Sequence, residues 1–205
     1  FNGPLYAVNP KEDSVQGIKT YKEVEQLPEV DLAILAIPPK PCLAAIEVLT
    51  KQKNTKGFII ISAGFSEGDE EGSRIENEIV TLINNVDGCL IGPNCIGVLN
   101  ANYRGVFTTP TPTMVKDGCD LISSSGAMAL FTMEAGIQNG LRFSSIFSVG
   151  NAAQTSVEDV LEYLDLNYIE GESARTKLLY METISNPKKL LKHASDKAPT
   201  GRQYY

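Results

Sequence analysis

Four predicted strands in the first half of the chain end in residues that could contact a ligand. The segments that follow these strands are Asn9-Pro10-Lys11, Pro38-Pro39, Ser62-Ala63-Gly64-Phe65 and Gly92-Pro93-Asn94-Cys95. In an open parallel sheet, ligands bind past the carboxyl ends of the strands. Small or rigid residues there let a ligand approach the backbone, Lys11 offers a charge for a phosphate, and Asn94 can donate and accept hydrogen bonds. Together they predict a site for an extended polar ligand, although loop punctuation explains any single one.

The second half of the chain repeats this arrangement with serine and glutamate. The segment Ser123-Ser124-Ser125-Gly126 leads from a predicted strand into a predicted helix, whose N-terminus would attract phosphate through its N–H groups and dipole. Capping of the helix by serine alone is an equal alternative. Small residues also follow the next strand, at 149–153. Glu182 follows a third strand, where it either orients a histidine supplied from elsewhere or lies on the surface as an ordinary glutamate.

Several common catalytic motifs are missing from the sequence. Neither G-x-G-x-x-G nor G-x-x-x-x-G-K-[ST] occurs, so no signature of a nicotinamide cofactor or a P-loop nucleotide is present. A serine at a strand-to-helix turn is also typical of a hydrolase nucleophile, but G-x-S-x-G is absent. The sole histidine, His193, lies in a lysine-rich segment and is interpreted as a solvated helix-face residue. A catalytic triad therefore lacks its base.

The elements that position these residues alternate between strands and helices, which predicts an α/β fold with two parallel-sheet domains. The run 31–37 is apolar on both faces and is expected near the centre of its sheet, covered by helices on both sides. Ser156 and Asp159 resemble a capping box at the start of a helix. Predicted strands are 5–8, 32–37, 58–61, 89–91, 120–122, 143–149 and 178–181, and predicted helices are 43–49, 75–86, 127–135, 156–164 and 187–194.

The alternation is interrupted between the two halves. Threonine and proline alternate over 108–113, a composition that supports neither a helix nor a central strand. We therefore expect a first domain over 1–100, a linker over 101–118 and a second domain over 119–205. Because the chain begins with Phe1 in place of an initiator methionine, we also expect it to be an excised piece of a longer protein.

Composition excludes several classes of function. The 205 residues include 18 basic and 25 acidic ones, and a net charge of −7 without a basic stripe argues against nucleic-acid binding. No apolar run approaches about 18 residues, which argues against a membrane span. Four cysteines without a CxxC pair, together with one histidine, indicate neither a zinc site nor a disulfide framework. The sequence thus predicts a cytoplasmic protein without a bound metal.

Six segments, in this order along the chain, resemble the NDP-forming (ADP-forming) acyl-CoA synthetases, which are relatives of the succinyl-CoA synthetase alpha subunit. The resemblance extends over about residues 5–195 and implies a Rossmann-like CoA-binding domain followed by a flavodoxin-like ligase domain. It further implies interconversion of acyl-CoA, NDP and phosphate with free acid, CoA and NTP, through an acyl phosphate and a phosphohistidine. The six segments are Val8-Asn-Pro-Lys11, Ala36-Ile-Pro38, Ser62-Ala-Gly-Phe65, Gly92-Pro-Asn-Cys-Ile-Gly97, Ser123-Ser-Ser-Gly-Ala127 and Ser148-Val-Gly-Asn151.

The resemblance also implies roles for individual residues. Ser123, Ser125 and Gly126 would hold phosphate, and Glu182 resembles the glutamate that hydrogen-bonds the phosphorylated histidine. Nucleotide (ADP or ATP) and Mg²⁺ would bind an ATP-grasp domain or subunit outside this chain, and an oligomer is possible. The residues that would contact CoA or acyl-CoA are Asn9, Pro10, Lys11, Pro38, Ser62, Ala63, Gly64 and Asn94.

Two departures from the family pattern limit what this chain could do alone. The family's first strand and its Gly-rich turn precede the segments seen here, and its His-x-Gly loop follows one β/α unit later. His193 lacks the neighbouring glycines, so we do not assign it the phosphohistidine role and expect no turnover by the chain alone. Two alternatives remain open: a non-catalytic CoA-sensing module fused to an acetyltransferase, and a structural α/β scaffold with no affinity for CoA.

Overall fold

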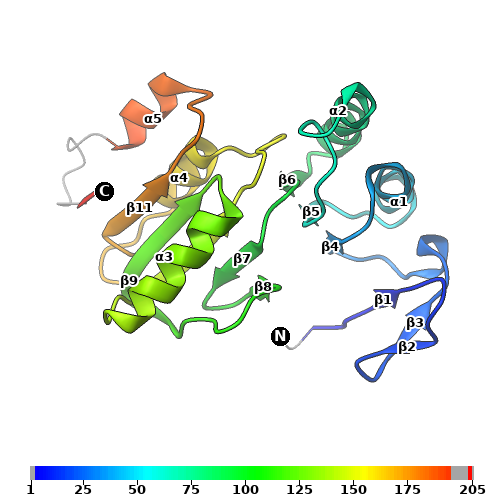
Figure 1. Ribbon diagram of the computed structural model, residues 1–205, viewed down its shortest axis with the longest axis horizontal. Coiled ribbons are helices and arrows are strands. Elements are labelled where there is room, and N and C mark those ends of the chain that lie inside the picture. The colour runs from blue at the N-terminus through cyan, green and yellow to red at the C-terminus, as the bar shows by residue number, and fades with distance from the viewer. Residues whose placement is uncertain (1–2, 195–202, 205) are drawn as a thin grey trace. The chain divides into compact units, whose positions relative to one another are not determined.

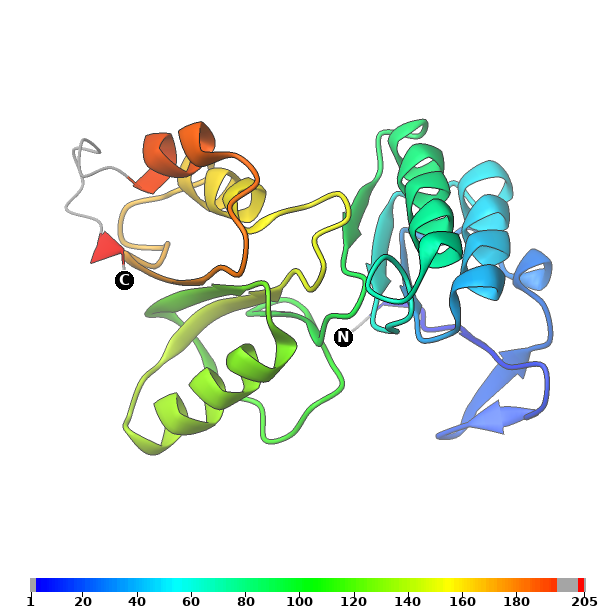
Figure 2. The same ribbon diagram turned by 45° about the horizontal axis from the view of Figure 1, so that its top comes forward.

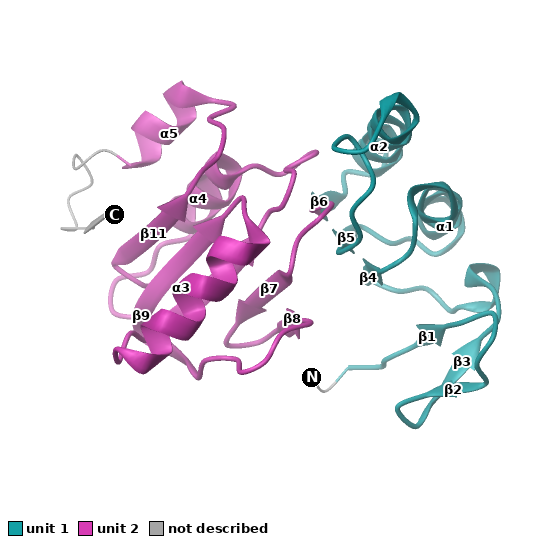
Figure 3. Cartoon of the chain, viewed as in Figure 1, with its two compact units in different colours: residues 1–90 teal, residues 91–205 magenta. Residues whose placement is uncertain are grey.

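The computed structural model describes residues 3–194 and 203–204 (Figure 1). The chain folds as two compact units, residues 1–90 and 91–205, each of which is treated separately (Figure 3). Strands and α-helices alternate from β4 to β6 in the first unit and from β9 to α5 in the second, as the apolar periodicity predicts.

The first unit contains two three-stranded sheets and two long helices. Strands β1, β3 and β2 form one sheet and strands β4, β5 and β6 form the other, with parallel pairing of β1 with β3 and of β4 with β5. The elements are β1 (Ala7–Val8), β2 (Ser14–Val15), β3 (Ile18–Tyr21), η1 (Val24–Gln26), β4 (Leu32–Leu35), α1 (Pro39–Gln52), β5 (Gly57–Ile60), α2 (Glu70–Asn84) and β6 (Cys89–Ile91). The last residue of β6 already belongs to the second unit.

Helices α1 and α2 lie side by side and bury one apolar stripe each (Figure 1). The stripe of α2 consists of Ile75, Ile79 and Ile83, all at most 2% exposed, which confirms the helical spacing predicted for this segment. Asp69 caps α2, since its side chain accepts the N–H of Gly72 at 2.7 Å. The carboxylate satisfies one of the N–H groups that the first turn of a helix leaves without an internal partner.

The expected central position of 31–37 is wrong for the sheet that the structure describes. Strand β4 lies at an edge of its sheet, and Ile34 is 49% exposed whereas Leu35 is buried. An apolar composition on both faces therefore does not show that both faces are covered. The sequence analysis also missed the hairpin of β2 and β3, whose two-residue turn, Gln16-Gly17, has positive φ at both positions. Such φ values are typical of a type I′ turn.

The second unit is built on one six-stranded sheet in the order β12-β11-β9-β10-β7-β8. Helix α3 lies on one face of this sheet, and α4 with α5 lies on the other (Figure 2). The elements are β7 (Gly97–Asn100), β8 (Arg104–Val106), β9 (Met114–Ser123), α3 (Gly126–Gln138), β10 (Phe143–Ser148), α4 (Val157–Leu166), β11 (Thr176–Tyr180), α5 (Pro187–Ala194) and β12 (Gln203–Tyr204).

The segment expected to be a linker, 101–118, contains strand β8 and the first part of β9. Strand β7 already belongs to the second unit, because it pairs antiparallel with β10. Within this segment, 101–103 and 107–113 have neither helix nor strand, and the longer of the two agrees with the threonine and proline content of 108–113. The boundary between the compact units thus precedes the expected one by ten residues (90 against 100), because β7 finds its partner far along the chain.

Strand β9 is the centre of the second sheet, pairing in parallel with β10 and with β11. Its Asp120 is 3% exposed and accepts hydrogen bonds from Lys177 of β11 and from Ser145 of β10, each at 2.5 Å. Lys177 also donates to the carbonyl of Ala174 at 2.7 Å. The charges are buried together, so each compensates for the desolvation of the other.

We expect Asp120→Asn to lower the free energy of unfolding of the second unit by about 3 kcal/mol or more, because Lys177 would keep its buried charge without a counterion. The matched control is Asp117→Asn, which removes an exposed ion pair with Arg142 and should cost less than about 1 kcal/mol. Urea unfolding followed on amide signals of β10 measures both losses. Equal losses for the two variants would contradict the stabilising role of the buried pair.

Candidate functional site

Three loops of the second unit start at the same level of the sheet. Ser123, the last residue of β9, is in register with Ser148 of β10 and with Tyr180 of β11. The residues that follow these three strand ends therefore emerge side by side at the carboxyl edge, where ligands bind in open parallel sheets. They are the serine turn before α3, the small-residue loop at 149–153 and the segment that carries Glu182.

The serine turn is fixed by its own side chains. The hydroxyl of Ser123 donates to the carbonyl of Ser125 at 2.7 Å and accepts its N–H at 3.2 Å. Ser125 caps α3 by accepting the N–H of Met128 at 3.3 Å, so the capping role weighed for this turn is confirmed. Gly126 is the first helical residue. The cap uses only the third N–H of the helix, and a helix leaves the N–H groups of its first residues without internal acceptors. The turn can therefore be a cap and also present N–H groups to an anion.

Glu182 lies against this turn, as its position after β11 predicts. Its backbone N–H donates to the hydroxyl of Ser124 at 3.0 Å, and the N–H of Ser124 donates to the carbonyl of Tyr180 at 3.0 Å. Glu182 is exposed. The structure thus joins a carboxylate-bearing loop to the N-terminus of α3 through the middle serine of the turn.

The loop at 149–153 contacts Asn94, which belongs to the second unit, through Asn151. The Asn94 side-chain amide donates to Asn151 Oδ1 at 3.3 Å, and the N–H of Asn151 donates to the carbonyl of Pro93 at 2.9 Å. The N–H of Val149 donates to the carbonyl of Ser123 at 2.9 Å, which ties this loop to the serine turn. Asn94, grouped with the CoA contacts of the first domain, is therefore beside the candidate phosphate turn.

Four of the other predicted residues meet in the first unit. The hydroxyl of Ser62 donates to the carbonyl of Ile37 at 2.6 Å, which joins the segments after β4 and β5. Pro38 is the N-cap residue of α1, and Gly64, two residues after Ser62, has φ +95°. The N–H of Gly64 is occupied by the Glu67 carboxylate at 2.7 Å. One end of the β4-β5-β6 sheet, the end at which β4 and β5 finish, is thus lined by Pro38, Ser62, Ala63 and Gly64.

Asn9, Pro10 and Lys11 follow β1, in the other sheet of the same unit. Asn9 Oδ1 accepts the N–H of Lys11 at 2.9 Å and that of Glu12 at 3.1 Å, which fixes the turn. The Lys11 side chain is exposed, as a phosphate-binding charge requires. This turn is the only one of the predicted set in the first unit that carries a positive charge.

Three of the four cysteines and the histidine are poor candidates for nucleophiles. Burial raises the pKa of Cys42 to about 12 and the pKa values of Cys95 and Cys119 to about 11, so these thiols stay protonated at neutral pH. His193 is 3% exposed and lies between Asp165 and Glu162 of α4, at 2.9 and 3.2 Å. The prediction of a solvated residue is therefore wrong. His193 faces carboxylates of α4, and the sequence around His193 does not show that α5 packs against that helix.

Comparison with known proteins gives the family. A profile described as "CoA binding domain" matches residues 2–101, and one described as "Succinyl-CoA ligase like flavodoxin domain" matches residues 116–200. The chain belongs to the ADP-forming acyl-CoA synthetase family. The resemblance and the fold class predicted from the sequence are thereby confirmed.

Two curated relatives and one solved structure illustrate the similarity. Acetate–CoA ligase [ADP-forming] I of Archaeoglobus fulgidus is 36% identical over 199 residues, which are 97% of this chain and 28% of the relative. Acetate–CoA ligase [ADP-forming] II subunit alpha of Pyrococcus furiosus is 36% identical over 94% of this chain and 41% of the relative. Acetyl-coenzyme A synthetase 1 of Candidatus Korarchaeum cryptofilum, solved with phosphate and ADP, has a TM-score of 0.79 and 29% identity over 95% of this chain and 41% of that one. The chain thus spans between about a quarter and two fifths of these synthetases.

Substitution of Gly150 tests the packing of the three loops. Its φ is +55°, and a Cβ there would lie 2.1 Å from the carbonyl oxygen of Pro93. Gly140, with φ +77° and no atom within 4 Å of its Cβ position, is the matched control. We expect Gly140→Ala to cost about 1 to 2 kcal/mol of stability from backbone strain alone, and Gly150→Ala to cost at least about twice as much because the clash adds to the strain.

Gly150→Ala should also shift the side-chain amide signals of Asn94 and Asn151, which Gly140→Ala should leave in place. Urea unfolding and NMR spectra of both variants provide the measurement. Equal stability losses, with the Asn94 and Asn151 signals unmoved, would show that the loops do not depend on this close approach.

Proposed function

We propose that this chain is the CoA-binding and ligase part of an ADP-forming acyl-CoA synthetase. The reaction interconverts acyl-CoA, ADP and phosphate with free acid, CoA and ATP. The observation that carries the proposal is the common register of Ser123, Ser148 and Tyr180, which sets the serine turn, the Asn94–Asn151 pair and Glu182 around one sheet edge. This edge of the sheet is suited to phosphate, because helix N–H groups and neutral side-chain amides there can donate hydrogen bonds to an anion.

The first step would transfer the acyl group from sulfur to phosphate. A phosphate oxygen attacks the thioester carbonyl carbon, the C–S bond breaks, and CoA leaves as a thiolate that takes up a proton. Gly126 and its neighbours would hold the phosphate through backbone N–H groups, and Asn94 would donate its amide to the acyl phosphate. Pro38, Ser62, Ala63 and Gly64, with Asn9, Pro10 and Lys11, would hold CoA along the first unit.

The second step would move the phosphoryl group from the acyl phosphate to a histidine nitrogen, releasing the free acid. Glu182 would accept a hydrogen bond from the other ring nitrogen, which favours the reactive tautomer and stabilises the charged ring. His193 does not fit this role because it is buried between two carboxylates of α4. The receiving histidine, together with ADP and Mg²⁺ on an ATP-grasp part, would come from outside this chain.

A non-catalytic CoA-sensing module would share the first unit's site but would not need the phosphoryl site. The two functions therefore differ in what the second unit does, and a test of each unit separates them.

Lys11→Ala tests the CoA site of the first unit. If Lys11 meets a CoA phosphate, the variant should weaken CoA binding by about ten- to a hundredfold, as expected for the loss of a charge-assisted hydrogen bond. A CoA analogue that lacks the contacted phosphate should bind the variant and the parent chain equally. Lys19→Ala, on β3, is the matched control and should leave the affinity unchanged. Calorimetry measures all of these affinities, and an equal loss for both ligands would argue against the contact.

Gly126→Val tests the phosphoryl site of the second unit. A Cβ at Gly126 would lie 3.0 Å from the Ile96 side chain, so the branched side chain of valine would crowd the first turn of α3. In the complete synthetase we expect this variant to abolish labelling of the histidine by γ-labelled ATP while CoA affinity stays within about twofold. Acid-labile label and calorimetry give the two readouts. Label found on His193 would overturn the assignment of the receiving histidine.

A further inference from the structure

The loop that carries Glu182 has little contact with the core. Residues 182–187 are exposed, and the one large apolar side chain in this part of the described chain, Ile184, is 49% exposed. The position of the loop must therefore be set by polar contacts at its two ends. One end is the hydrogen bond from the N–H of Glu182 to the hydroxyl of Ser124 at 3.0 Å.

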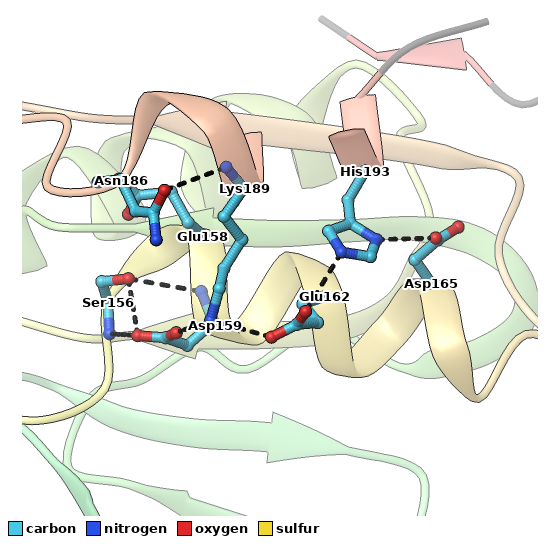
Figure 4. A network of polar contacts seen from close by, with 8 residues as sticks. All are labelled: Ser156, Glu158, Asp159, Glu162, Asp165, Asn186, Lys189 and His193. Atoms are coloured by element: carbon cyan, nitrogen blue, oxygen red, sulfur yellow. Dashed lines mark hydrogen bonds and ion pairs between the residues drawn. The ribbon is translucent and has the colours of Figure 1, made fainter. Parts of the chain in front are cut away.

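The other end is held by Glu158, the second residue of α4, which is 1% exposed (Figure 4). Its Oε1 accepts the backbone N–H of Asn186 at 2.9 Å. Asn186 in turn begins α5, because its side-chain oxygen accepts the N–H of Lys189 at 3.0 Å and its carbonyl accepts the N–H of Leu190 at 3.0 Å. Only three residues lie between Glu182 and Asn186, so fixing one restricts the other.

Glu158 is ionised in this environment. Burial alone would raise the pKa of its carboxyl, but hydrogen bonds from the N–H groups of Asn186, Glu158 itself and Ser185, and from the Ser156 hydroxyl, outweigh burial and lower the pKa. The contact with Asn186 is therefore a charge-assisted hydrogen bond in a shielded position, which is stronger than a neutral one. Its contribution to stability is present above the unfolded-state pKa of glutamate and is lost as the pH falls through the lowered value.

The rest of α5 is fixed to α4 by ion pairs. Lys189 lies 2.6 Å from Asp159 and 2.8 Å from Glu162, and these two carboxylates raise the pKa of the Lys189 amine. His193, near the end of α5, contacts Glu162 and Asp165 (Figure 4). Helix α5 is thus attached along its length, and the loop is stretched between Ser124 and a fixed point at Asn186.

We propose that Glu158 is a positioning residue for the phosphoryl-transfer site: it holds Asn186 and thereby sets the loop that carries Glu182 over the Ser123–Gly126 turn. This inference rests on the proposed function in so far as it gives Glu182 a role in phosphoryl transfer. Glu158 itself is buried and contacts no reacting atom.

The positioning can be tested on the chain itself by amide hydrogen exchange. Glu158→Gln should accelerate exchange at Asn186 and Glu182 by about tenfold, the size expected for the loss of a charge-assisted hydrogen bond. Glu134→Gln is the matched control, because it removes an exposed carboxylate from α3, which lies on the other face of the sheet. It should leave the exchange of Glu182 within about twofold. Unchanged exchange at Asn186 and Glu182 in Glu158→Gln would overturn the proposal.

A second measurement needs no variant. In the unmutated chain, the amide proton shift of Asn186 should titrate with a midpoint below the ordinary glutamate pKa of about 4.3. A shift that does not titrate, or a midpoint above that value, would contradict an ionised Glu158 as its partner.

The link to catalysis requires the complete synthetase. Glu158→Gln should lower the rate of histidine phosphorylation by about ten- to a hundredfold through misplacement of Glu182, with the KM for CoA unchanged. In the Glu182→Gln background the same change should cost no more than about twofold, because the group that it positions is gone. Additive losses would overturn the coupling. If even the parent synthetase does not phosphorylate its histidine, the proposed function fails, while the exchange and titration results still decide whether Glu158 holds the loop.

Discussion

The buried carboxylate of Asp120 ties together the three strands on which the second unit depends. It lies on β9 and contacts Lys177 of β11 and Ser145 of β10, so one ion pair and one hydrogen bond fix the relative level of all three strands. Removal of either charged group would leave the other buried without a counterion, which is strongly destabilising. The register that brings Ser123, Ser148 and Tyr180 to one level follows from this constraint together with the parallel ladders.

A common level at the carboxyl edge turns three unrelated loops into one site. Ser124 connects the turn before α3 to the segment after β11, and Val149 connects the loop after β10 to Ser123. Asn94 enters from a fourth segment through Asn151. The candidate site is therefore built mainly from backbone N–H groups, hydroxyls and amides, which are suited to binding an anion. The carboxylate at this edge is that of Glu182, and Glu158, which holds its loop, lies on α4.

Much of the fold could be predicted from the sequence. The spacing of apolar residues indicates strands and helices, and small or capping residues indicate where these elements end. The helix stripe ending at Ile83 and the capping box of Ser156 and Asp159 are both present as predicted. The pairing of the strands, and therefore the order of the strands in each sheet, could not be predicted in the same way. Pairing between β7 and β10 joins residues almost fifty positions apart, so nothing local shows that Asn94 belongs with the second unit. Burial of Glu158 and His193 likewise depends on the packing of α4 against α5, and each charged residue alone is typical of a solvated surface.

The most direct test of an anion site at the first turn of α3 is the mapping of amide shifts when inorganic phosphate is added to the isotope-labelled chain. If an anion binds there, the backbone amides of Gly126 and Ala127 and the side-chain amides of Asn94 and Asn151 should shift together with a single affinity. Shifts confined to the exposed lysines of α5, with Gly126 and Ala127 unmoved, would contradict it.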